Sequence, residues 1–182
     1  LRNEPRIAVS WFGDGATDTG AFWESLNFAA LKRVPCLFVC ENNHLSNVMP
    51  KSQHMHVELH QMAAQFMPSE RADGCNVSAV YAAAERAVAY VRAERAPFFL
   101  ECVTKRWMKH QGVDADDLAC NPVDRERDCP ILRLRRDLLA DGRAQTSSVA
   151  AVEAEVESVL DDAFAFAERS PFPTPEALFQ ES

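Results

Sequence analysis

The chain has 182 residues, a formal net charge of −8 at pH 7 and a pI of about 5.1. This length is sufficient for one domain with a sizeable hydrophobic core. The acidic balance argues against nucleic acid as a partner, because nucleic-acid binding needs a basic surface. Charged residues interrupt the apolar runs well short of the length of a membrane span, so we also expect no membrane partner.

The cysteine usage favours a reducing compartment. Six cysteines stand at positions 36, 40, 75, 102, 120 and 129, and no two of them have Cys-x-x-Cys spacing. Three lie in apolar runs that predict buried strands, where cysteine acts as a small hydrophobe. The first six residues are charged and do not read as a signal peptide. We therefore expect a cytoplasmic protein without a disulfide framework.

Hydrophobic patterning predicts alternating strands and helices. Three apolar runs predict buried strands, each covered on both faces, at residues 7–12, 36–40 and 98–103. Amphipathic stretches predict helices that begin near Thr19 and that cover residues 57–67 and 77–94. Residues 71–74 predict a turn or a short edge segment. This alternation is typical of an α/β fold with a parallel sheet.

The C-terminal part of the sequence has a different character. Residues 105–128 lack any period and predict a long loop. Two further helices are predicted at residues 131–139 and 149–168, before a tail with three prolines. We therefore expect an α/β domain over residues 1–128 and a helical extension over residues 129–182.

The stretch from Gly13 to Asn43 carries the clearest chemical signal. Gly13-Asp14-Gly15 follows the first predicted strand, and Asn42-Asn43 follows the second. A helical crossover makes these strands parallel, so both ends lie at one edge of the sheet. Asp14 and Asn43 would then present two oxygens to a hard cation. The spacing predicts a Mg²⁺ that neutralises a diphosphate.

The wider sequence resembles a known family. Residues 13–31 and 34–43, then Ala72-Asp-Gly74, Ala96-Pro97 and residues 101–106 with His110, occur in the order found in the α subunit of the E1 component of 2-oxo acid dehydrogenase complexes. That group includes the pyruvate, branched-chain and acetoin enzymes. The resemblance implies a three-layer α/β/α thiamine-diphosphate-binding fold with a partial sheet and a C-terminal helical appendage. Family α subunits have a further N-terminal half, so we expect either a fragment or one piece of a split α subunit.

The resemblance also assigns roles to individual residues. Asp14 and Asn43 match side-chain ligands of Mg²⁺, and Leu45 matches a ligand through its backbone carbonyl. The amides of Gly15 and Ala16 would approach the diphosphate of thiamine diphosphate, near a helix N-terminus.

His110 matches the active-site histidine of the family, which can donate to a diphosphate oxygen or transfer a proton. The surrounding loop departs from the family pattern at two positions. Met108 replaces a second histidine that many members have, and Gln111 stands where regulated members have a phosphorylatable serine. We therefore expect no phosphorylation control at position 111.

The resemblance implies an enzyme subunit that works only with partners. The expected reaction is decarboxylation of a 2-oxo acid and acyl transfer to a lipoyl acceptor protein. An E1 β-like subunit would supply the glutamate that activates the aminopyrimidine, and a separate chain could supply the missing N-terminal half. Two alternatives remain open: a split transketolase-like or acyloin-forming carboligase subunit, and a non-catalytic scaffold or regulatory subunit.

Three histidines form a second group of polar residues. His54, His56 and His60 are close in sequence, and the last two would share a helix face. Glu58 is the nearest carboxylate and is expected to point away. We interpret the histidines as a surface cluster rather than a metal site.

Overall fold

The computed structural model describes residues 5–111 and 124–179, and the chain divides into two compact units, Leu1–Leu134 and Arg135–Ser182. The sequence analysis places this boundary at residue 128, and in the structure it falls slightly later, after Leu134. Arg133 explains part of this difference, because its guanidinium lies 2.9 Å from the Asp73 carboxylate of the first unit.

The first unit contains a parallel sheet of four strands. The strands are β1 (Ala8–Gly13), β2 (Cys36–Asn42), β3 (Ser69–Asp73) and β4 (Phe98–Val103), in the order β1-β2-β4-β3. The predicted α/β class is confirmed, and β3 is a fourth strand in addition to the three predicted from apolar runs. β3 is a half-exposed edge strand with a polar sequence, so it has no apolar run that would predict it. It overlaps the edge segment considered for residues 71–74.

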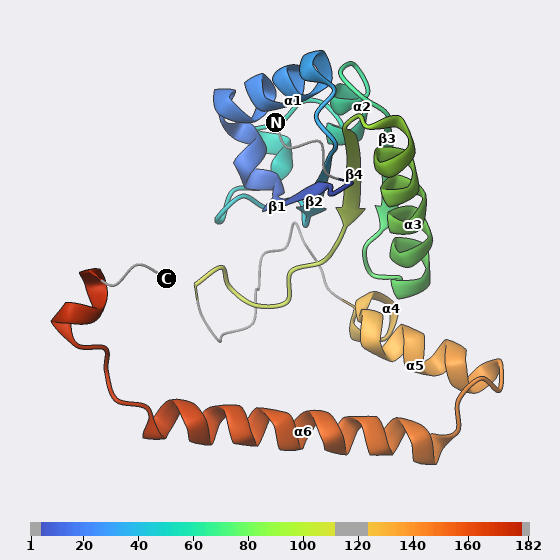
Figure 1. The fold of residues 1–182 in the computed structure, drawn as a ribbon. Helices are drawn as coiled ribbons and strands as arrows, with labels where there is room; N and C mark the ends of the chain where they lie inside the picture. Colours follow the sequence, from blue (N-terminus) through green and yellow to red (C-terminus); the bar gives the residue numbers. More distant parts are fainter. Residues whose placement is uncertain (1–4, 112–123, 180–182) are drawn as a thin grey trace. The chain divides into compact units, whose positions relative to one another are not determined.

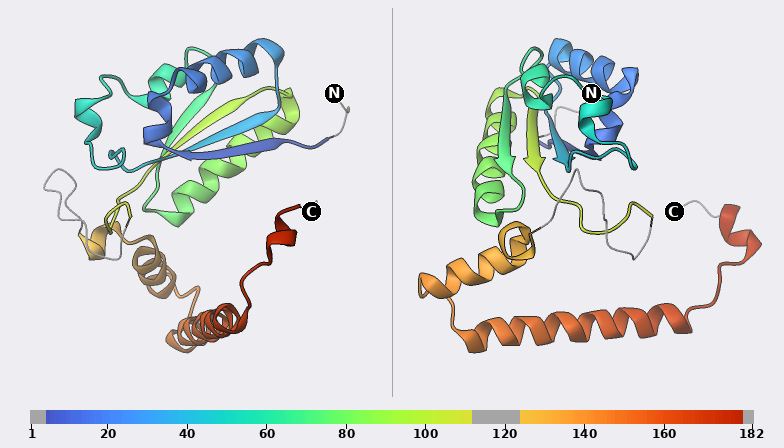
Figure 2. Two further views of the ribbon diagram at one scale, coloured as in Figure 1. Left: turned by 90° about the vertical axis from the view of Figure 1, so that its left-hand side faces the viewer. Right: turned by 180° about the vertical axis from the view of Figure 1, so that it is seen from behind.

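Helices cover both faces of this sheet (Figures 1 and 2). They are α1 (Gly20–Lys32), α2 (Leu59–Ala63) and α3 (Val77–Glu94), with short 3-10 helices η1 (Asp14–Asp18) and η2 (Lys51–Gln53). In the left view of Figure 2, α1 and α2 lie on one side of the strands and α3 lies on the other. The helix predicted at residues 57–67 is limited to α2, because residues after Ala63 form turns that lead into β3.

Two apolar cores flank the sheet, because successive strand side chains point to opposite faces. On one face, Phe38, Cys40 and Phe99 pack with Leu26 of α1 and Leu59 of α2. On the other face, the strands pack against the small side chains of α3. That second core contains Leu37, Val39, Ala83, Ala87, Val91, Phe98, Leu100 and Cys102.

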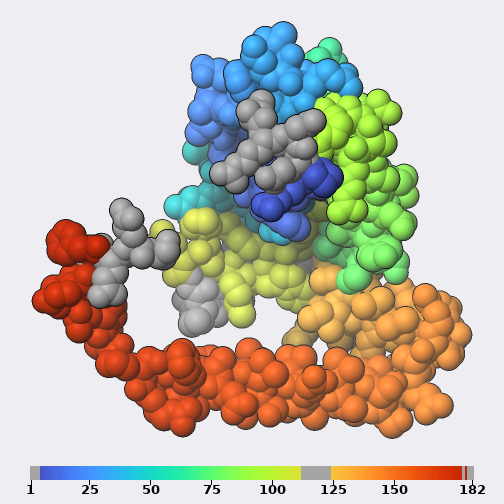
Figure 3. All heavy atoms as spheres, viewed as in Figure 1, coloured from blue at the N-terminus to red at the C-terminus, as the bar shows by residue number. Residues whose placement is uncertain are grey.

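Strand β1 is less covered than its apolar sequence predicts. Within the described residues it pairs only with β2, and Val9 and Trp11 are 46% and 68% exposed. Its dark blue region reaches the molecular surface in Figure 3. The expectation of a strand covered on both faces is therefore wrong for this chain, and one edge of its sheet is open.

The remaining helices lie within the second described range, residues 124–179. They are α4 (Arg125–Asp128), α5 (Pro130–Ala140) and α6 (Thr146–Arg169), followed by the 3-10 helix η3 (Pro175–Phe179). α5 is followed by Gly142, whose φ of 67° is left-handed. The apolar stripe of α6 is exposed at Val152, Val156, Leu160 and Phe164. Over the described ranges, none of the helices combines the length and the apolarity needed to cross a membrane.

Candidate functional site

The first predicted site residue, Asp14, lies at the edge of the sheet where β1 ends. It begins η1 and is only 2% exposed. The Thr17 hydroxyl donates to the Asp14 carbonyl at 2.6 Å, which fixes the turn. The Asp14 Oδ2 atom is buried without a hydrogen-bond partner in the described structure. A buried, unpaired carboxylate oxygen is costly unless a cation or a proton satisfies it.

The electrostatics of Asp14 reflect this burial. Burial raises the pKa of Asp14 from 3.8 to about 6. The backbone N–H groups of Asp14 and Gly15 and the nearby imidazole of His54 oppose this rise but do not cancel it. The carboxylate is therefore ionised at neutral pH, at a cost that a bound Mg²⁺ would remove.

The loop that follows β2 carries the next two predicted residues. The Asn43 Oδ1 atom accepts a hydrogen bond from the Leu45 N–H at 3.0 Å. Leu45 is 3% exposed and forms an isolated antiparallel bridge with Pro50. His44, between them, has a left-handed φ of 62°. These contacts form a tight turn that begins one residue beyond the end of β2.

The loop after β2 lies directly against η1. A Cβ atom at Gly15 would lie 2.9 Å from the Ser46 Oγ and 3.4 Å from its Cα. Only glycine allows this approach without displacement of Ser46. Ala16, the next residue, is exposed. The fold therefore brings Gly15 next to Ser46, at the edge of the sheet where the parallel strands β1 and β2 both end.

The segment after β4 reaches the same loop. Arg106 Nη1 donates to the backbone carbonyl of Ser46 at 3.3 Å and to that of Asn47 at 2.7 Å. His110 follows in the same segment and is exposed. Its predicted catalytic role stays a prediction.

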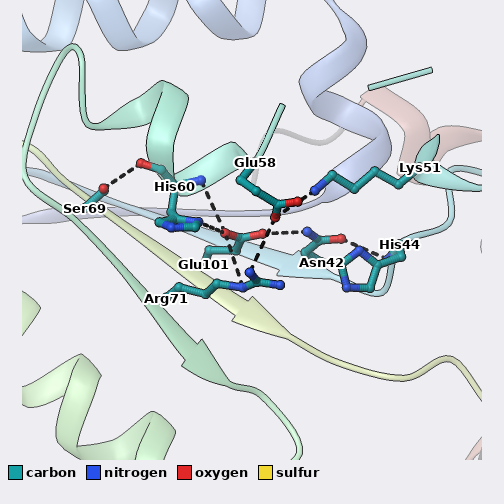
Figure 4. A network of polar contacts seen from close by, with 8 residues as sticks. All are labelled: Asn42, His44, Lys51, Glu58, His60, Ser69, Arg71 and Glu101. Atoms are coloured by element: carbon teal, nitrogen blue, oxygen red, sulfur yellow. Dashed lines mark hydrogen bonds and ion pairs between the residues drawn. The ribbon is translucent and has the colours of Figure 1, made fainter. Parts of the chain in front are cut away.

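Beneath the loop lies a polar network that connects β2, β4 and α2 (Figure 4). The Asn42 Nδ2 donates to Glu101 Oε1 at 2.5 Å, and the Asn42 Oδ1 accepts from the His44 N–H at 2.9 Å. The other Glu101 oxygen lies 3.3 Å from the His60 backbone nitrogen and 2.9 Å from His60 Nδ1. Both Asn42 and Glu101 are fully buried.

The second arm of this network is an ion-pair cluster around Glu58 (Figure 4). Lys51 Nζ lies 3.0 Å from the Glu58 carboxylate, and Arg71 Nη1 lies 3.4 Å from it. The contact with Lys51 lowers the pKa of Glu58. Burial and the nearby Lys51 lower the pKa of His44.

The structure corrects the interpretation of the histidines. His54 Nδ1 lies 2.8 Å from Asp18 Oδ1, and the His54 side chain is only 10% exposed, so it does not belong to a surface cluster. Glu58 does not point away: its carboxylate lies within 4.8 Å of ligand atoms of His60 and Glu101. The carboxylates of Glu58 and Glu101 already lie close to side-chain cations. Lys51 and Arg71 pair with Glu58, and Arg71 lies 4.0 Å from Glu101, which leaves little attraction for a metal ion there.

Sequence reasoning missed the role of Glu101. The signal was available, because Glu101 is the single charged residue of the apolar run 98–103. A charged side chain inside a doubly covered strand needs buried partners. The sequence could not identify these partners, since Asn42 and His60 come from other elements.

Known proteins resemble this chain over nearly its whole length. The sequence model of the family described as "Dehydrogenase E1 component" matches residues 1–176. The chain is 33% identical to the pyruvate dehydrogenase E1 component subunit alpha of Porphyra purpurea, over 93% of this chain and 51% of that protein. It is 32% identical to the mitochondrial subunit alpha of Solanum tuberosum, over 98% of this chain and 46% of the relative.

A bacterial relative gives the same picture. The subunit alpha of Rhizobium meliloti (strain 1021) is 31% identical, over 98% of this chain and 53% of that protein. The chain thus spans about half the length of the curated relatives that it matches.

Proposed function

The chain belongs to the dehydrogenase E1 component family, and on that premise we propose that it is an E1 α-type subunit of a thiamine-diphosphate-dependent 2-oxo acid dehydrogenase. Its part is to bind Mg²⁺ and the diphosphate of the cofactor. The observation that carries this proposal is the buried Asp14 Oδ2, which has no hydrogen-bond partner among the described residues. The next residue, Gly15, lies directly against Ser46 in the loop that carries Asn43 and Leu45.

The donor set at this edge of the sheet suits Mg²⁺. Asp14 offers a carboxylate oxygen, Asn43 a side-chain carbonyl and Leu45 a backbone carbonyl, and Mg²⁺ prefers oxygen ligands. The backbone amides of Gly15 and Ala16 would bind the diphosphate, whose charge the metal neutralises. When bound, thiamine diphosphate supplies the nucleophilic carbon and the electron sink for decarboxylation of a 2-oxo acid.

His110 is proposed to act at the reacting end of the cofactor. Its imidazole can donate to a diphosphate oxygen or transfer a proton near neutral pH. The Arg106 contacts with the loop after β2 support this role, because they hold the start of the same segment at the candidate site.

Two partners are needed for turnover in this proposal. An E1 β-like subunit would supply the glutamate that activates the aminopyrimidine, and a lipoyl protein would accept the acyl group. The chain covers about half of each curated relative, and the exposed edge at β1 supports a further need for a part that continues the sheet, from this polypeptide or another. A hollow of about 260 Å³ beside β1, lined by Val9, Trp11, Val80, Ala84 and Val88, gives that part an apolar surface to cover.

The test compares Asp14→Ala with Asp162→Ala in the complex that the full chain forms with its co-purifying partners. Asp162 is an exposed carboxylate on α6, in the second compact unit, so its replacement makes the same charge change at a residue outside the proposed donor set. We expect Asp14→Ala to abolish Mg²⁺-dependent thiamine diphosphate binding and 2-oxo-acid-dependent acylation of lipoamide, and Asp162→Ala to leave both unchanged.

The same assay separates the alternatives. Formation of a C–C bond without acylation of lipoamide would replace the proposal with a transketolase-like or acyloin-forming carboligase. Full turnover in Asp14→Ala would eliminate both enzymatic functions and leave a scaffold or regulatory subunit.

A further inference from the structure

The turn that would hold the metal depends on one strained residue. His44 adopts a left-handed conformation, with φ of 62°, between the two proposed ligand residues Asn43 and Leu45. This conformation is strained for a residue other than glycine, so local hydrogen bonds must stabilise it. Two bonds hold His44: its N–H donates to the Asn42 Oδ1 at 2.9 Å, and its carbonyl accepts from the Lys51 N–H at 2.8 Å. The first of these depends on a side chain.

This bond requires one particular orientation of the Asn42 amide. The amide could rotate by 180° and exchange its oxygen and nitrogen, which would point two donors at each other near His44. Glu101 opposes this rotation, because its Oε1 atom accepts a hydrogen bond from the Asn42 Nδ2 at 2.5 Å, and the rotation would replace that donor with the amide oxygen. Glu101 thus determines which end of the Asn42 amide faces the loop.

His60 in turn holds the Glu101 carboxylate. Its backbone N–H and its Nδ1 atom both lie within hydrogen-bonding distance of Glu101 Oε2, at 3.3 and 2.9 Å. Arg71 Nε lies 4.0 Å from the same oxygen. Figure 4 shows the resulting series, from His60 through Glu101 and Asn42 to His44.

We propose that Glu101, held by His60, is a positioning residue for the metal-binding loop: it orients the Asn42 amide, which fixes the turn of Asn43 and Leu45 and thereby sets the affinity of that turn for a divalent ion. Residues that orient metal ligands typically change affinity by about 10- to 100-fold when they are replaced. The inference rests on the proposed function for its metal, but the effect on the loop can be measured without one.

The experiment uses the full chain with Glu101→Gln, which keeps the shape of the side chain but adds a donor. The matched control is Glu70→Gln on the neighbouring strand β3, which removes the same charge from an ion pair with Arg86 at the surface. Amide exchange by NMR reports on the His44 and Leu45 N–H groups, and binding of Mn²⁺ in the presence of thiamine diphosphate reports on the site.

We expect Glu101→Gln to accelerate amide exchange at His44 at least tenfold and to weaken Mn²⁺ binding about tenfold. Amide exchange in α3 should stay at its wild-type rate in this variant. In the control Glu70→Gln, the melting temperature should stay within the wild-type range. If Glu101→Gln does not fold, His60→Phe replaces it. That variant keeps the Asn42 contact and removes only the Nδ1 contact, so a smaller effect in the same direction is expected.

The outcomes distinguish this inference from the proposed function. Unchanged exchange at His44 and unchanged Mn²⁺ affinity would overturn the positioning role of Glu101. Faster exchange at His44 with an unchanged Mn²⁺ affinity would overturn its link to the metal. If neither the wild type nor Asp14→Ala binds Mn²⁺, the proposed function fails, and amide exchange alone then decides whether Glu101 fixes the loop.

Discussion

Replacement of Asp14 by asparagine should stabilise the chain in the absence of Mg²⁺, although it removes a residue that the proposed function needs. Burial raises the pKa of Asp14 from 3.8 to about 6, so the folded state holds the proton more strongly than the unfolded state does. The contribution of Asp14 to the free energy of unfolding should therefore fall as the pH rises from about 4 to about 6, and level off above that range.

The size of this effect follows from the pKa difference. At about 1.36 kcal/mol per pKa unit, ionised Asp14 costs the metal-free fold up to about 3 kcal/mol at pH 8. The amide of the Asp14→Asn variant stays neutral and keeps an oxygen that can accept the backbone N–H bonds. We therefore expect Asp14→Asn to be more stable than the wild type by about 1–3 kcal/mol at pH 8 and equally stable at about pH 3.5.

Urea unfolding monitored by tryptophan fluorescence, at several pH values from about 3.5 to about 8 in EDTA, measures this difference. Asp162→Asn on α6 serves as the control for a simple loss of charge. Addition of Mg²⁺ and thiamine diphosphate should then stabilise the wild type and not Asp14→Asn, which reverses their order. A wild type that is more stable than Asp14→Asn at the highest pH in EDTA, or parallel pH profiles for the two proteins, would refute the reasoning.

Three further predictions follow from close contacts and burial. Gly15→Ala should weaken Mn²⁺ binding, measured by titration, severalfold, because the new Cβ would lie 2.9 Å from Ser46 Oγ. Ser46→Gly in the same chain should restore binding, and failure of that rescue would contradict the contact. Gly74→Ala should destabilise the chain by about 2 kcal/mol in urea unfolding, because its Cβ would lie 2.7 Å from the Val103 carbonyl oxygen; a variant of wild-type stability would be inconsistent with this packing. Burial raises the pKa of the Cys36, Cys40 and Cys102 thiols, so these three should react with Ellman's reagent only on unfolding, and rapid modification of any of them in the native chain, detected by peptide mass spectrometry, would argue against the core described above.

Much of the fold could be predicted from local patterns. Strands β2 and β4 are apolar runs that match their predicted ranges closely, and α3 covers the residues 77–94 that the amphipathic pattern predicts as a helix. Strand β3 could not be predicted with the same certainty, because Ser-Glu-Arg-Ala-Asp has no hydrophobic pattern and is ordered by its pairing with β4. The shortening of α2 likewise depends on the turns that carry the chain into β3.

The candidate site divides in the same way. The order of residues was enough to place Asp14 and Asn43 after two strands joined by a helix, and parallel strands must end at one edge of the sheet. The order of residues did not show that the neighbouring Asn42 and Asn43 have different partners. Only the folded chain shows this. Asn43 bonds within its own turn, whereas Asn42 contacts Glu101, which lies 59 residues away in the chain. The spacing along a strand fixes which edge its residues reach, but the partner of a buried polar group depends on which distant element packs over it.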